Sequence, residues 1–314
     1  MKLREGIGFL ALAGCIALGL MIARASEVRS GTWAILHSDT PGDVRLSLMV
    51  SYKDGHSNEE SDWPVSDLQG LDLSKQGRHD VRFTISRDAG KFECEGFLEN
   101  GEGAGLFHFT PDEAFAQNMR SLGFDGVDDE KQFSMAVHNV SLQFAQEMKN
   151  ERLENLDTDK LIAFRIFGVS RKFIEDVRAA GVNVTDSDKL IAFRIHGVSP
   201  EMIRQLHQSG YKPDEDTLIA MRIHGATPEW IEQLRQRGYD HVELEKLIAF
   251  RIHGVSPEFI EKLQGLGYKH PEEDELIAMR IHGVTPEYIS DMRSRGIKDL
   301  TIDKLIAMRI HGID

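Results

Sequence analysis

Lys246-Leu-Ile-Ala-Phe-Arg-Ile-His-Gly254 decides the fold, because near copies of this nonapeptide recur throughout the second half of the chain. The copies begin at positions 160, 189, 217, 246, 275 and 304, so the motif returns every 28 or 29 residues. A fixed period of this size is typical of repeat architectures, in which neighbouring units stack on one another. We therefore predict a solenoid-like array of helical hairpins over residues 157–314.

Each repeat contains signals for two short helices. In Ser256-Pro-Glu-Phe-Ile-Glu-Lys-Leu-Gln-Gly-Leu-Gly-Tyr268, the serine is suited to cap a helix, the proline to begin it and Gly267 to end it. The nonapeptide forms the second helix and ends at a glycine. Helices of about ten residues are marginal alone in water, so neighbouring units must stabilise them. The expected structural caps are Ser199, Thr227, Ser256, Thr285, Gly210, Gly238 and Gly267.

Residues 26–110 have a different period, in which apolar and polar residues alternate as they do in half-buried strands. The alternation is clearest at residues 44–52 and 81–85, and further strands are expected at residues 91–98 and 105–109. Residues 53–61 are polar and acidic, and we interpret them as an exposed loop. The sequence thus predicts an α+β fold, with a small antiparallel β-rich head of four or five strands followed by the helical array.

Residues 111–156 are expected to connect the head to the array through capping helices. Thr110-Pro-Asp-Glu113 has the pattern of a capping box, so we place a helix start at Thr110. Residues 131–141 are a degenerate copy of the repeat, in which His138 precedes Phe167 by 29 residues. The array is therefore expected to begin with a degenerate unit.

Residues 1–25 are expected to direct export as a signal peptide or N-terminal membrane anchor. Lys2 and Arg4 precede an apolar run, and Ala23-Arg-Ala25 is typical of a signal-peptide cleavage site. Retention of the run as an uncleaved anchor is one alternative. Lipidation of Cys15 is another, because Leu12-Ala-Gly-Cys15 resembles a lipobox. All three place the rest of the chain in the periplasm or another extracytoplasmic space, with membrane contact only through this segment.

Composition and motifs argue against several functions. The net charge of −14 repels phosphate backbones, so we expect no nucleic-acid partner. Cys15 and Cys94 are the only cysteines, and no structural disulfide is expected because Cys15 lies in the N-terminal apolar run. The sequence lacks His-Glu-x-x-His, Gly-x-Ser-x-Gly and a phosphate-binding loop. We therefore predict a non-enzymatic protein without catalytic residues or a cofactor.

The histidine and the arginine of the nonapeptide are its polar candidates for function. Each histidine is expected in a last helical turn, where it meets free carbonyl groups. Packed helices lie about 8–10 Å apart, which is too far for successive histidines to share a metal, so no metal site is predicted. The nonapeptide's leucine and isoleucines are expected to pack against the next unit.

Two interpretations of the arginines remain open. In the first, they pair with acids of the neighbouring helices, namely Glu201, Glu229, Glu258 and Glu287. In the second, they form a strip that binds an anionic partner, which makes Arg194, Arg222, Arg251 and Arg280 the partner-binding residues.

Residues 247–260, Leu-Ile-Ala-Phe-Arg-Ile-His-Gly-Val-Ser-Pro-Glu-Phe-Ile, carry a resemblance together with Trp33 and Asp39-Thr-Pro-Gly-Asp-Val-Arg-Leu46. They resemble envelope proteins of acidobacteria, and similar repeats occur outside the membrane segments of BlaR-type antirepressor metallopeptidases. The peptidase's zinc motif is absent here, so the resemblance implies no peptidase activity. It implies an extracytoplasmic accessory, sensor or interaction module.

The favoured function is therefore a non-enzymatic extracytoplasmic protein whose repeat surface binds a protein or envelope partner. One alternative is a small-ligand binder or enzyme with its site in the β-rich head. Another is a structural envelope protein. The sequence does not define the oligomeric state.

Overall fold

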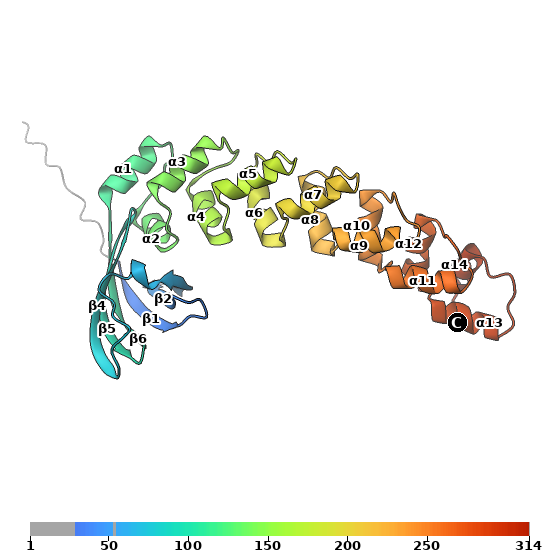
Figure 1. Cartoon of the computed structure of the whole chain (residues 1–314), viewed down its shortest axis with the longest axis horizontal. Coiled ribbons are helices and arrows are strands. Elements are labelled where there is room, and N and C mark those ends of the chain that lie inside the picture. The colour runs from blue at the N-terminus through green and yellow to red at the C-terminus, as the bar shows by residue number, and fades with distance from the viewer. Residues whose placement is uncertain (1–28, 53–54, 314) are drawn as a thin grey trace, which may run out of the picture.

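The computed structural model describes residues 29–52 and 55–313 and shows an elongated molecule, with a sheet at one end and helices extending away from it (Figure 1). The described residues form six strands in one antiparallel sheet of order β3-β2-β1-β6-β5-β4. The strands are β1 (Arg29–His37), β2 (Asp43–Tyr52), β3 (Gly55–Pro64), β4 (Arg78–Arg87), β5 (Gly90–Glu99) and β6 (Glu102–Pro111).

One face of the sheet is packed around Trp33, which is 1% exposed. Trp33 lies opposite Gly105 of β6, which in turn pairs with Gly96 of β5. A Cβ atom at Gly105 would lie 2.7 Å from the indole Nε1, so the glycine leaves room for the ring to cross the sheet. Trp33 Nε1 donates to the Glu95 carbonyl at 3.2 Å, which satisfies the polar atom of this buried ring.

A helix and a connecting segment cover the rest of this packed face. Phe133 of α2 (Asp129–Val137) contacts the rings of Phe92, Phe107 and Phe109. The connection between β3 and β4 includes the 3₁₀ helix η1 (Val65–Asp67) and the buried Leu68. The same helix α2 also contacts the first regular repeat helix, so the core of the head continues into the array.

Helices α1 to α14 follow the sheet and confirm the predicted helical array. Their bounds are α1 (Glu113–Ser121), α2 (Asp129–Val137), α3 (Leu142–Asn150), α4 (Thr158–Phe167), α5 (Arg171–Ala179), α6 (Ser187–His196), α7 (Pro200–Gln208), α8 (Glu215–His224), α9 (Pro228–Arg235), α10 (Leu244–His253), α11 (Pro257–Gly265), α12 (Glu273–Ile281), α13 (Pro286–Ser294) and α14 (Ile302–Ile310).

The repeat helices form two rows. Helices α2, α4, α6, α8, α10, α12 and α14 contact one another in series, and we name them the even row. Helices α5, α7, α9, α11 and α13 also contact one another in series, and we name them the odd row. Each repeat thus contributes one helix to each row, and the rows extend away from the sheet (Figure 1).

Two local predictions were wrong. Thr110 and Pro111 do not begin a helix, because they pair with Lys91 and Gly90 at the end of β6. Asp112 caps α1 instead and accepts a hydrogen bond from the Phe115 N–H at 2.9 Å. The expected loop over residues 53–61 is largely strand β3, which lies at the edge of the sheet, where polar residues are common.

The odd-row helices begin at the expected hydroxyl residues. Ser199, Thr227, Ser256 and Thr285 accept hydrogen bonds from the N–H groups of Met202, Trp230, Phe259 and Tyr288 at 3.1, 3.3, 3.2 and 3.1 Å. Gly210, Gly238 and Gly267 have φ angles of 91°, 95° and 92°, which suit a residue just after a helix. Tyr268 N–H then donates to the Leu263 carbonyl at 3.1 Å and closes the last turn of α11.

The predictions for residues 1–25, including lipidation of Cys15, lie outside the described residues. Within the described ranges, no helix is both long and apolar enough to cross a membrane.

Candidate binding surface on the helical array

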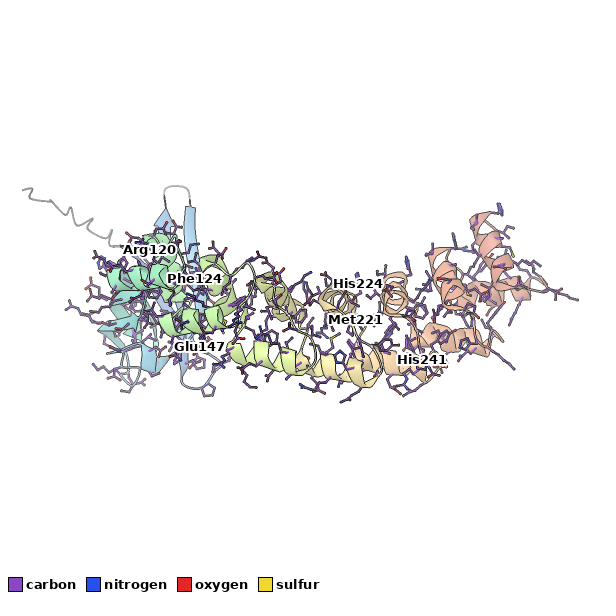
Figure 2. The ribbon with its side chains drawn as sticks, turned by 90° about the horizontal axis from the view of Figure 1, so that it is seen from above. Arg120, Phe124, Glu147, Met221, His224 and His241 are labelled. Carbon is purple, nitrogen blue, oxygen red and sulfur yellow. The ribbon has the colours of Figure 1, made fainter. Side chains whose placement is uncertain are left out.

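The even-row helices are apolar on two faces. In α10, Leu247 and Phe250 are 1% and 0% exposed and pack into the core, whereas Ile252 is 54% exposed. Figure 2 labels the equivalent region of α8, where Met221 is buried between the rows and His224 is exposed. The expectation that both isoleucines of the nonapeptide pack against the next unit is therefore wrong for the second one.

An exposed isoleucine recurs at this position in every copy of the nonapeptide. We name these residues the isoleucine ladder, which consists of Ile166 (51% exposed), Ile195 (53%), Ile223 (55%), Ile252 (54%), Ile281 (55%) and Ile310 (59%). A single exposed apolar residue is ordinary, but a regular series is typical of an interaction surface.

Each step of the ladder lies at the end of a column of residues on one helix face. In α10 the column is Glu245, Ala249 and Ile252, which follow the i, i+4, i+7 spacing of one face. Ala249 is half-buried and small, so it does not cover the isoleucine. The exposed face of each even-row helix from α4 to α14 is therefore acidic at its start, flat in the middle and apolar at its end.

The arginine beside each ladder residue joins successive repeats. Arg251 Nε donates to the His224 carbonyl of the preceding even-row helix at 3.0 Å, and its guanidinium lies 5.2 Å from the centre of the Trp230 ring. Its Nη2 atom lies against Gly225, where a Cβ atom would come within 2.8 Å. A cation at the C-terminal end of a helix also meets the negative end of the helix dipole. Arg251 thus caps the preceding repeat.

The same arginine contact recurs along the whole even row, including the degenerate first unit. The Nε atoms of Arg165, Arg194, Arg222, Arg280 and Arg309 donate to the carbonyls of His138, Phe167, His196, His253 and His282 at 3.1, 2.9, 3.1, 3.3 and 3.3 Å. The same hydrogen bond thus joins each pair of successive even-row helices, so the ladder isoleucines occupy equivalent positions along the array.

The arginines of the nonapeptide contact backbone carbonyls of the preceding repeat. Two of the acids expected to pair with them have other partners, since Glu201 pairs with Arg204 at 2.8 Å and Glu287 with Lys262 at 3.3 Å. The predicted partner-binding residues Arg194, Arg222, Arg251 and Arg280 are all engaged with the preceding repeat. A binding role for these four guanidinium groups stays a prediction.

The starts of the even-row helices form an acidic edge. Lysines of one repeat pair with aspartates of the next in Lys131–Asp159, Lys160–Asp188, Lys189–Asp216 and Lys246–Asp274. The hydrogen bonds to these aspartates raise the pKa values of Lys160 and Lys189. Even so, the aspartate side chains stay 58–80% exposed, so the edge presents carboxylates to solvent.

The acidic edge is densest at helices α8, α10 and α12. Their first turns contain Asp214, Glu215, Asp216, Glu243, Glu245, Glu272, Glu273, Asp274 and Glu275. Burial raises the pKa of Glu273, and the neighbouring carboxylates of Asp274, Glu272 and Glu243 contribute in the same direction, although Lys246 opposes them. This crowding of like charges makes the electrostatic potential at the edge negative.

The backbone carbonyls of the repeat histidines accept the hydrogen bonds from the arginines of the following repeat. The side chains of His224, His253 and His282 are exposed at the ends of α8 and α10 and just after α12. In the part of the chain that the structure describes, no group of three or more His, Cys, Asp or Glu residues is placed to hold a metal ion.

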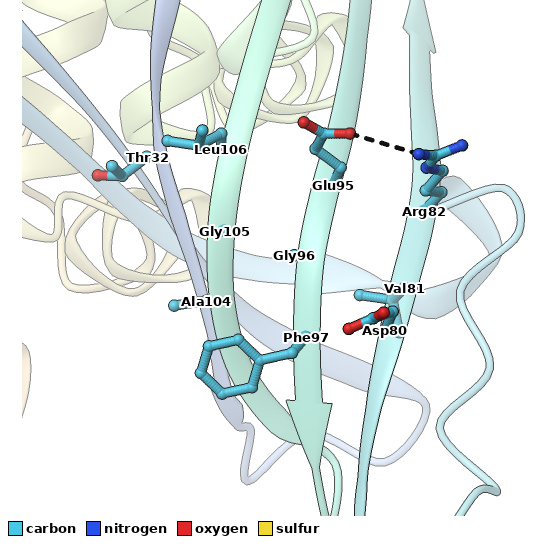
Figure 3. A pocket seen from close by; sticks show the side chains of 10 residues that line it. All are labelled: Thr32, Asp80, Val81, Arg82, Glu95, Gly96, Phe97, Ala104, Gly105 and Leu106. Atoms are coloured by element: carbon cyan, nitrogen blue, oxygen red, sulfur yellow. Dashed lines mark ion pairs between the residues drawn. The ribbon is translucent and has the colours of Figure 1, made fainter.

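The head contains a separate open cavity of about 810 Å³ on the outer face of the sheet (Figure 3). Phe97 and Leu106 contribute apolar surface, and Arg82 and Glu95 form an ion pair of 3.8 Å beside them. The Arg82 and Glu95 side chains are 87% and 56% exposed, so water reaches both charged groups.

No protein-family model, curated protein or solved structure matches this chain. The isoleucine ladder, and the acidic edge at the opposite ends of the same helices, are therefore the strongest guides to function.

Proposed function

We propose that the protein is a non-enzymatic interaction module that binds a protein partner along the isoleucine ladder. The observation that carries this proposal is the repetition of an isoleucine that is more than half exposed in each repeat. Folding alone gives no reason to keep a large apolar side chain at such a position, because exposed isoleucine contributes little to packing. Extended concave or flat surfaces built from equivalent repeat positions are a common mode of binding in solenoids.

We place this interaction outside the cytoplasm, as an accessory or sensor function at the bacterial envelope. The basic and apolar N-terminal segment with Ala23-Arg-Ala25 supports this location. The resemblance of the repeats to the outer part of BlaR-type proteins supports the same proposal. A purely structural envelope protein would instead need no specific partner at the ladder.

Site-specific photo-cross-linking in cells tests the proposal. A photoreactive amino acid replaces His253, which is exposed beside Ile252, and a matched variant carries it at Gln233, which is exposed on the odd row. We expect a discrete cross-linked protein from position 253 and none from position 233. Equal products from both positions, or none from position 253, would contradict binding at the ladder.

The cavity on the outer face of the sheet favours a second candidate, a small-ligand site in the head. Arg82 and Glu95 lie next to the apolar surface of Phe97 and Leu106, and this combination suits a small amphipathic molecule. A ligand screen by thermal shift, repeated with Leu106→Arg, tests this candidate. A shift that persists unchanged in the variant would place the ligand elsewhere.

A further inference from the structure

We infer that the occupant of the isoleucine ladder is an extended cationic polypeptide in the polyproline II conformation, with an apolar side chain at every third residue. This inference rests on the proposed function and specifies the partner of the same surface.

The spacing of the ladder isoleucines matches one turn of a polyproline II helix. Its residues lie on helices that contact one another in series, and packed helices are about 8–10 Å apart. A polyproline II helix has three residues per turn and a rise of about 3.1 Å, which gives about 9.3 Å per turn. Every third side chain of such a segment therefore meets one ladder isoleucine.

Other backbone conformations fit this spacing less well. In a β-strand, side chains on one face recur about every 6.6–6.8 Å, so they lose register with the ladder after one or two repeats. In an α-helix, one residue in seven recurs at about 10.5 Å. Such a helix would place its intervening i+3 and i+4 side chains between ladder steps.

The negative charge of the acidic edge favours basic side chains on a second face of the occupant. The acidic edge lies at the opposite end of each even-row helix from the ladder, as Asp216 does from Ile223 and Asp274 from Ile281. Seven residues of helix separate them, a distance of about 10 Å, which long basic side chains on a second face of the occupant can span. The third face of a polyproline II segment is left to solvent.

The same charge argues against two other occupants. A second copy of this chain has the same net charge of −14 and would be repelled. An anionic membrane surface would be repelled in the same way. A basic polypeptide is the occupant whose charge complements the edge, where Glu243, Glu245 and Glu272 are exposed in addition to the aspartates that pair with lysines.

Synthetic peptides test the inference with the purified full-length chain in detergent. The probe is a fluorescent peptide of six Pro-Ile-Lys triplets, measured by anisotropy. One control peptide has the same composition but irregularly spaced isoleucines, a second has glutamate in place of lysine, and a third is an amphipathic basic helix. We expect the triplet peptide to bind best, more tightly as triplets are added, and more weakly as salt screens the charges.

Protein variants locate the peptide. Ile223→Ser combined with Ile252→Ser is expected to weaken binding on the order of tenfold or more, because two apolar contacts are lost. Leu36→Ser, at a residue 46% exposed on the sheet and outside the cavity of the head, is the matched control and should leave the affinity unchanged. Circular dichroism of the variants checks that the helical array is retained.

The peptide and variant measurements can each overturn the inference. Equal binding of the irregular, acidic or helical peptide, or an unchanged affinity of the double isoleucine variant, would overturn the inference. If position 253 cross-links in cells but the triplet peptide does not bind, the polyproline II inference fails and the proposed function stands. If position 253 does not cross-link, the proposed function fails as well.

Discussion

The helices of both rows bury apolar residues on their inner faces, but the outer faces of the two rows differ. Odd-row helices place charged pairs outside, as in Lys172–Asp176 and Arg204–Glu201, both at 2.8 Å. Even-row helices place Ile223, Ile252 and their equivalents outside, where each is more than half exposed. Because both rows bury their inner faces, the difference is not explained by stability. The exposed apolar residues of the even row are the basis of the proposal that this row contacts another molecule.

The largest expected effect contrasts two residues of one helix. Phe250→Ala removes a fully buried ring from α10 and should lower the free energy of unfolding by about 3–5 kcal/mol. Ile252→Ala, two residues farther on, should change it by less than about 0.5 kcal/mol. Urea denaturation followed by circular dichroism measures both. A large loss in Ile252→Ala would show that the ladder serves folding.

The next contrast compares an arginine of each row. Arg251→Gln removes the contact with the His224 carbonyl and the Trp230 ring, and should cost about 2 kcal/mol of unfolding free energy. Arg204→Gln removes only an exposed pair with Glu201 within one odd-row helix, and should cost less than about 1 kcal/mol. Equal losses in the two variants would mean that Arg251 does not join the repeats.

The starts of two successive helices, α11 of the odd row and α10 of the even row, give a smaller contrast. Ser256 accepts a hydrogen bond from the Phe259 N–H at 3.2 Å, so Ser256→Ala should cost about 1 kcal/mol. Glu243 precedes α10 without a side-chain cap, so Glu243→Ala should be close to neutral. Thermal unfolding of the two variants under one condition separates these cases, and the opposite order would argue against the assigned caps.

The smallest expected effect concerns pH at the junction of head and array. Burial lowers the pKa of His138, Arg165 adds to this shift, and Glu59, with its Oε2 3.6 Å from the imidazole Nε2, opposes it. The unfolded chain therefore takes up the proton first, so stability should fall as the pH drops through about 6.5. The fall in stability between pH 7.5 and 5.5 should be smaller in His138→Gln than in the parent chain. Urea unfolding midpoints of both proteins at the two pH values measure it.

The repeats were predictable because their signals are local. Ser256, Pro257 and Gly267 specify a helix start and stop through contacts with nearby backbone, and the fixed period places each hairpin beside the next. The predicted α+β architecture was confirmed, because the alternation of the strands is also a local signal. Strand β3 was missed because its sequence is polar, as is common at the edge of a sheet. The strand forms by pairing with β2, and its own composition gives little signal of this pairing.

The candidate surface was harder to predict because it depends on contacts between repeats. The arginine contact joins Arg251 to a carbonyl 27 residues earlier, and a carbonyl has no sequence signature. The exposure of Ile252 had a signal, since Leu247 and Phe250 already fill the inner face and place Ile252 on the other one. Two apolar faces on one short helix are the pattern that would have identified the ladder.

The central claim is that the isoleucine ladder serves binding and contributes little to folding. The most direct test measures both properties in one variant, Ile195→Ser with Ile223→Ser and Ile281→Ser, which retains the photoreactive residue at position 253. We predict a urea midpoint close to that of the parent chain, because serine and isoleucine have similar helix propensities, together with loss of the cross-linked partner. An unchanged cross-linking yield, or a large fall in the urea midpoint, would contradict the claim.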